Sequence, residues 1–128
     1  MTAEAVQAFV GNAHADIDAV RSALDEEPQL ANAAWDWGGG DWETALGAAS
    51  HMGRRDIALL LLERGARLDV FAAAMLGYVE VVREMLAAFP LVAETPGPHG
   101  IPLIAHAEAG GNEALEVVEL LRSKVASA

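Results

Sequence analysis

The side chains best suited to chemistry in this sequence are four histidines, His14, His51, His99 and His106. An imidazole can bind a transition metal or exchange a proton near neutral pH. However, no H-E-x-x-H or H-x-H spacing joins any two of them. His106 also falls at an inward position of an expected helix, which is typical of a buried core histidine. The sequence therefore predicts no metal ligand, no catalytic residue and no bound cofactor.

Other catalytic arrangements are missing from the sequence as well. It has no G-x-S-x-G, P-loop or dinucleotide-binding motif, and it has no cysteine for a thiolate site or a disulfide. Ser50 precedes His51, but adjacent residues of a helix do not face each other. We therefore expect a protein that is not an enzyme. A small metal-dependent hydrolase is the least favoured alternative, and a pocket that brings His51 together with carboxylates would support it.

All three tryptophans, Trp35, Trp37 and Trp42, lie in one short segment with the sequence W-D-W-G-G-G-D-W. Three consecutive glycines exclude the interior of a helix, so we expect a projecting turn. Exposed aromatic rings on such a turn are typical of protein-binding hot spots, because they bury a large area at a small entropic cost. The alternative is that the rings fold back over the apolar end of the core, and we expect one of the three to do so.

The elements that must position these residues are clearest between Thr44 and Ala66. A first helix is expected to begin near Thr44, and a second should follow a tight turn at Gly53, where glycine tolerates a left-handed backbone. Gly65 stands where a helix commonly ends. Apolar residues recur at the helical period, and the inward-facing positions are Leu46, Ala49, Ser50, Ile57, Ala58, Leu61 and Leu62.

The succession of a small residue, a polar residue and an apolar helix occurs four times along the chain. One such unit cannot bury its apolar face alone, so the units are expected to stack on one another. The chain is therefore interpreted as a single domain, 1–128, with approximate repeats 1–43, 44–68, 69–100 and 101–128.

The unit between Thr44 and Ala66 resembles the ankyrin repeat, whose helices open with T-P-L-H-x-A and close with Gly-Ala. Ala45 and Gly47 replace the proline and the histidine of that motif. This resemblance, to small ankyrin repeat proteins of the bacterial type, implies an all-α solenoid of about four helix-turn-helix repeats. The family resemblance implies protein–protein recognition through a concave face and projecting loops. The matching residues are Thr44, Leu46, Ala49, Gly53, Leu61, Leu62, Gly65 and Ala66.

Two connections depart from the ankyrin pattern. The first is lengthened by the tryptophan segment, and the second is so short that residues 67–69 must join two helices almost directly. The lengthened turn, the concave face and an acidic rim together give the predicted contacts with a partner. These contacts are Trp35, Trp37, Trp42, His51, Met52 and Met75, with Asp36, Asp41, Glu43 and Glu94 as the rim.

Composition and charge limit the class of partner. The chain is 53% hydrophobic with a net charge of −11, which opposes binding to nucleic acid or to anionic membranes. The N-terminus lacks a basic segment typical of a secretory signal. We therefore expect a cytoplasmic monomer that binds a protein, with a basic partner favoured by charge. The alternative is a structural accessory subunit that packs permanently on a larger complex or on itself.

Overall fold

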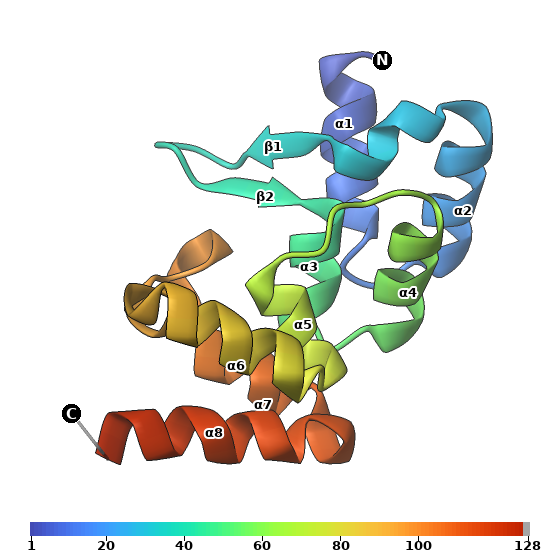
Figure 1. Cartoon of the computed structure of the whole chain (residues 1–128). Helices are drawn as coiled ribbons and strands as arrows, with labels where there is room; N and C mark the ends of the chain where they lie inside the picture. Colours follow the sequence, from blue (N-terminus) through green and yellow to red (C-terminus); the bar gives the residue numbers. More distant parts are fainter. Residues whose placement is uncertain (127–128) are drawn as a thin grey trace.

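The computed structural model describes residues 1–126 and is mostly helical (Figure 1). The expected all-α class is confirmed at this level, with one small two-stranded sheet in addition. No helix in the described part of the chain is long and apolar enough to cross a membrane. The α-helices are α1 (Ala3–Asn12), α2 (Ile17–Glu26), α3 (Ala45–His51), α4 (Arg55–Glu63), α5 (Val70–Leu76), α6 (Val79–Ala88), α7 (Leu103–Ala109) and α8 (Leu115–Ala126). The short 3-10 helices are η1 (Pro28–Asn32), η2 (Pro90–Glu94), η3 (Pro98–Gly100) and η4 (Gly111–Ala114).

The helices are arranged in successive pairs. Helices α1 and α2, α3 and α4, α5 and α6, and α7 and α8 contact each other, and α1, α3, α5 and α7 form a row of contacts between the pairs. Figure 1 shows the pairs following one another from blue to red, with the hairpin of β1 and β2 extending to one side. The inner helices α3 and α5 are therefore covered by neighbours on both sides.

The close packing of the inner helices depends on small residues. All residues of α3 from Ala45 to Ser50 are buried. Gly53 has a φ of 67° after α3, and a Cβ there would lie 2.4 Å from the backbone oxygen of Ala109. Only glycine combines that conformation with that approach, which confirms the expected tight turn between α3 and α4.

Side-chain caps set where two of the inner helices begin. The hydroxyl of Thr44 accepts a hydrogen bond of 2.9 Å from the backbone N–H of Gly47. The carboxylate of Asp69 accepts one of 2.8 Å from Ala72 at the start of α5. Such caps satisfy N–H groups that have no partner within the helix. The connection from α4 to α5 comprises residues 64–69, so it is longer than the direct link through residues 67–69 that the sequence predicts.

The tryptophan segment forms an antiparallel β-hairpin. Strands β1 (Ala34–Asp36) and β2 (Trp42–Thr44) pair Trp35 with Glu43 and Asp36 with Trp42. The three glycines between them have positive φ, and the carboxylate of Asp36 accepts hydrogen bonds from the N–H groups of Gly38 and Gly40. The prediction of a non-helical turn is confirmed, and the strand pairing is an addition to it. The pairing fixes which side chains of β2 point inward.

Candidate metal centre

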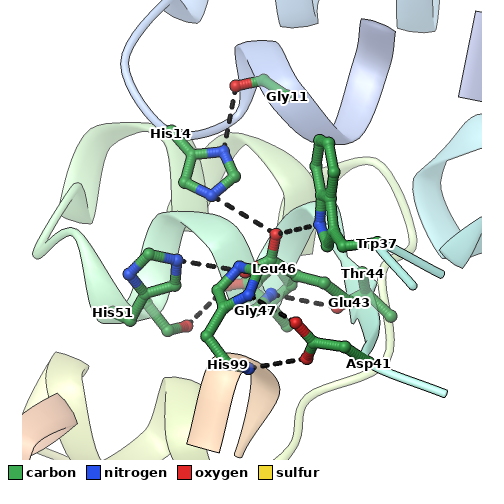
Figure 2. A network of polar contacts seen from close by, with 11 residues as sticks. Gly11, His14, Trp37, Asp41, Glu43, Thr44, Leu46, Gly47, His51 and His99 are labelled. Atoms are coloured by element: carbon green, nitrogen blue, oxygen red, sulfur yellow. Dashed lines mark hydrogen bonds and ion pairs between the residues drawn. The ribbon is translucent and has the colours of Figure 1, made fainter. Parts of the chain in front are cut away.

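A cluster of three histidines and one glutamate lies at the base of the hairpin (Figure 2). His14 follows α1, Glu43 lies in β2, His51 ends α3 and His99 lies in η3. Each of the four residues offers a ligand atom, and these atoms all lie within 4.8 Å of one another. Four elements thus bring metal-ligating side chains to one point, and His14 and His99 come from parts of the chain far from Glu43 and His51.

Glu43 is the centre of the cluster and is buried. Its Oε1 accepts a hydrogen bond of 3.0 Å from Trp37 Nε1 and lies 3.3 Å from His14 Nε2. Its Oε2 lies 3.0 Å from His51 Nε2 and 3.2 Å from His99 Nε2. Side chains alternate between the two faces of a strand, so Glu43 points inward while its neighbour Trp42 points outward. A single carboxylate therefore faces three imidazoles.

Two of the imidazoles are held in place through their other ring nitrogen. His14 Nδ1 lies 2.9 Å from the carbonyl oxygen of Gly11, and His99 Nδ1 lies 2.7 Å from Asp41 Oδ2. Both oxygens act as acceptors, so each Nδ1 carries the hydrogen, and Nε2 carries the lone pair in the neutral ring. Contacts of this kind orient histidine ligands toward metal ions in proteins.

The backbone at His99 supports the same arrangement. His99 has a φ of 61°, the one positive value at a non-glycine residue in the described chain. Its backbone N–H donates a hydrogen bond of 2.7 Å to Asp41 Oδ1, so Asp41 holds both the backbone and the ring of His99. A left-handed conformation at a residue with a Cβ costs free energy and is often found at functional sites. The hairpin is thus joined to the loop that precedes α7.

Two buried polar atoms of the cluster have no hydrogen-bond partner among the described residues. They are Glu43 Oε2 and His51 Nε2. The two atoms are 3.0 Å apart, yet their directions do not satisfy the geometry of a hydrogen bond. Leaving such atoms buried and unsatisfied costs about 1–3 kcal/mol each. A cation between them would satisfy both.

Contacts between the carboxylates and the histidines shift the pKa values of Glu43 and His99 in opposite directions. Burial alone would raise the pKa of Glu43, but contacts with His51 and Trp37 and the charges of His14 and His99 lower it below its usual value. Desolvation opposes a charge on His99, but Asp41 and Glu43 outweigh it and raise the pKa of His99. In the absence of a metal, His99 therefore retains a proton to higher pH than an exposed histidine does.

The spacing of the cluster suits a small transition-metal ion. Zn²⁺ lies about 2.0–2.1 Å from imidazole nitrogen, which puts tetrahedral ligand atoms about 3.3–3.4 Å apart. The contacts between Glu43 oxygens and the three Nε2 atoms are 3.3, 3.0 and 3.2 Å. Three imidazoles and a carboxylate are also donors for Fe²⁺, Co²⁺ and Ni²⁺. All the ligand atoms of the cluster lie within 4.8 Å of one another.

The three tryptophans have different environments. Trp35 is partly buried against the core cluster that contains α1 and α3, as expected for one ring of the three. Trp42 is 61% exposed. Trp37 is also exposed but donates its N–H to Glu43, so it belongs to the cluster as well as to the surface. The sequence did not indicate this contact.

Several predicted contact residues lie elsewhere than expected. Glu43 is buried, so its assignment to an exposed acidic rim is wrong, because strand alternation turns it inward. Met75 is also buried, because α5 is packed between α3 and α7, and its assignment as a partner contact is wrong. His51 faces Glu43 rather than solvent. Met52 is exposed, and the two rim residues Asp36 and Glu94 are half-buried and exposed, respectively.

His106 lies beside the cluster but does not join it. It is buried as the sequence predicts, and its Nδ1 lies 3.0 Å from the carbonyl oxygen of Pro102. Its Nε2 has no partner in the described structure, and its ring centroid is 6.5 Å from that of His51. Burial lowers the pKa of His106.

No protein-family model, curated protein or solved structure matches this chain. The geometry of the cluster is therefore the basis for assigning a function.

Proposed function

We propose that the protein binds a divalent transition-metal ion between Glu43, His14, His51 and His99. The observation that carries this proposal is that Glu43 Oε2 and His51 Nε2 are buried 3.0 Å apart, yet neither has a hydrogen bond among the described residues. They lie beside His14 and His99, whose Nδ1 atoms are already anchored. Such anchoring leaves Nε2 available as a ligand.

A metal ion is an alternative to hydrogens on the three Nε2 atoms. Each Nε2 near a Glu43 oxygen needs either a proton or a cation, because two lone pairs repel one another. His51 can carry its single hydrogen on Nε2. His14 and His99 already donate through Nδ1, so a hydrogen on Nε2 as well would make both rings cations, with ring centroids 6.4 Å apart. One divalent ion bound by the Nε2 atoms would take the place of these hydrogens.

The scaffold that we propose for this site is an ankyrin-like solenoid. The successive helix pairs, the glycine turn at Gly53 and the capping threonine Thr44 support this assignment. On this scaffold, the ion would tie the hairpin to the loop that contains His99. Because the ion binds only the folded chain, it adds to the free energy of unfolding.

Recognition of a protein partner is the second candidate function. The exposed side chain of Trp42 on the hairpin, together with exposed Met52 after α3, favours it, since aromatic residues and methionines are adaptable contacts. A net charge of −11 favours a basic partner. In this proposal the protein acts as a cytoplasmic monomer; a permanent accessory subunit or a self-associating protein is the alternative.

The metal proposal is tested by titrating the metal-free protein with Zn²⁺ in a calorimeter and by recording its thermal unfolding. We expect one ion per chain and a stabilisation of about 2.7 kcal/mol when free Zn²⁺ is 100 times the dissociation constant. The variant Glu43→Gln keeps the side-chain shape and should lose both effects. His106→Leu is the matched control and should retain both. Equal binding by wild type and Glu43→Gln would contradict the proposal.

A further inference from the structure

The cluster is closed on one side and open on the other. The side chains of Glu43 and His51 are 0% and 11% exposed, whereas those of His14 and His99 are 25% and 32% exposed. Trp37 lies beside the exposed pair, with centroid distances of 6.4 Å to His14 and 6.3 Å to His99. Solvent therefore reaches the face lined by His14, His99 and Trp37, while the opposite face is sealed by the core.

The two oxygens of Glu43 differ in their hydrogen bonds. Its Oε1 already accepts the N–H of Trp37, and its Oε2 is free of hydrogen bonds. With one ligand atom from each residue, the cluster offers four donors: Glu43 Oε2 and three imidazole nitrogens. Fe²⁺, Co²⁺ and Ni²⁺ accept more than four ligands in sites with nitrogen and oxygen donors.

The four donors are not equivalent. His51 and His99 lie nearest to Glu43 Oε2, at 3.0 and 3.2 Å, whereas His14 lies nearest to Oε1, at 3.3 Å. We call Glu43 Oε2, His51 and His99 the inner set of ligands, because both imidazoles lie beside Oε2, whereas His14 lies beside Oε1. Two histidines and one carboxylate are typical of metal sites that keep positions open for other ligands.

We infer that the bound ion keeps at least one coordination position open on the face lined by His14, His99 and Trp37. This inference rests on the proposed metal site. The position takes a water molecule or a small monoanionic ligand. A divalent ion with one carboxylate and neutral imidazoles has a charge of about +1, so one monoanion neutralises it. Asp41, already paired with His99, disfavours a second anion.

The test replaces the metal with Co²⁺, whose visible absorption depends on coordination number. Five- or six-coordinate Co²⁺ absorbs weakly, and tetrahedral Co²⁺ absorbs strongly. We expect weak bands in the Co²⁺-loaded protein and a saturable spectral change when azide, the monoanionic probe, is added. Trp42→Ala should behave like wild type, because Trp42 points away from the cluster.

A second variant separates His14 from the inner ligands. His14→Ala should still bind one Co²⁺ with reduced affinity and should respond to azide, whereas His51→Ala should not bind Co²⁺ at one ion per chain. Equal loss of Co²⁺ in both variants would contradict the division into inner and outer ligands.

The outcomes distinguish this inference from the proposal on which it rests. Strong tetrahedral bands that azide leaves unchanged would overturn the open position but would leave metal binding intact. Binding of Zn²⁺ without Co²⁺ would also overturn it, because an open site with these donors accepts both ions. A wild-type protein that binds neither ion would overturn the inference and the proposed function together.

Discussion

Two neighbouring regions of this protein hold histidines in contrasting ways. At the base of the hairpin, His14, His51 and His99 surround the carboxylate of Glu43. In the adjoining core, the side chain of His106 is fully buried. Its Nε2 has no hydrogen-bond partner within the described residues, and its ring centroid lies 4.7 Å from that of Phe71. The two regions are close, since the rings of His51 and His106 are 6.5 Å apart.

The difference between the two regions is the number of convergent ligands, not burial. His14, His99 and His106 all have Nδ1 near an oxygen acceptor, so orientation alone does not distinguish them. Among the described residues, His106 does not belong to a group of metal-ligating side chains, and its Nε2 has no hydrogen-bond partner. A buried histidine becomes a ligand only where other donors point to the same place.

The largest effect should follow from removing an inner ligand. His51→Ala takes away the imidazole nearest to Glu43 Oε2 and should weaken Zn²⁺ binding by more than the roughly 10–100-fold typical of changes to groups that only support a ligand. Competition titration with a chelating dye measures the affinity. His106→Leu provides the contrast, and an equal loss in that variant would remove the distinction between the two regions.

A smaller loss of Zn²⁺ affinity should follow from changing a residue that only orients a ligand. Asp41→Asn removes the charge that holds the ring of His99 but leaves an oxygen acceptor. Zn²⁺ affinity should fall by about 10–100-fold, with the stoichiometry unchanged. The same titration reports both quantities. Unaltered affinity would show that Asp41 does not position His99 for a metal.

Metal binding should weaken in acid, because protons compete with the metal ion for the histidine nitrogens. The pKa of His99 is raised above its ordinary value of 6.5 by Asp41 and Glu43, although desolvation opposes this. Zn²⁺ affinity should therefore begin to fall at a pH above 6.5 as the pH is lowered. Calorimetry over a series of pH values tests this. In Asp41→Asn the onset should move to lower pH, and an onset that does not move would contradict the assigned cause.

The core histidine should instead affect the stability of the metal-free protein. Burial lowers the pKa of His106 below its ordinary value of 6.5. As the pH falls through 6.5, the unfolded chain therefore takes up a proton at this residue before the folded chain does. The free energy of unfolding decreases as the pH falls below 6.5. His106→Leu should flatten this loss by up to about 1.4 kcal/mol per pH unit. Urea unfolding near neutral pH and in mild acid measures it. An unchanged pH slope would show that His106 is not held neutral.

The smallest effect on the metal is expected at the hairpin surface. Trp42 is exposed and faces away from Glu43, so Trp42→Ala should leave Zn²⁺ affinity within about 0.5 kcal/mol of wild type. Replacing all three tryptophans should instead remove capture of a protein partner from lysate. Unchanged capture by the triple variant would end the recognition proposal.

The helices were predictable because their signals are local. Thr44, Gly53 and Gly65 mark the ends of helices by their own chemistry, and the apolar residues of α4 recur at the helical period. The strands were missed because three glycines separate two short segments that form a sheet only by pairing with each other.

The candidate metal site had no local signal. Its ligands come from four segments, and His14 and His99 are separated by most of the chain. The inward direction of Glu43 depends on the pairing of β2 with β1, and the placing of His99 depends on hydrogen bonds to Asp41 across the fold. In many metal proteins the ligands are recognised by their spacing in the sequence. Here, tertiary packing brings the ligands together, so the sequence contains no such motif.

The comparison between the two histidine regions is tested most directly by imidazole ¹⁵N NMR of the protein during a Zn²⁺ titration. We expect the Nε2 resonances of His14, His51 and His99 to shift together and to saturate at one ion per chain, while those of His106 do not shift. Resonances that stay unchanged, or a shift of His106 equal to the others, would contradict it.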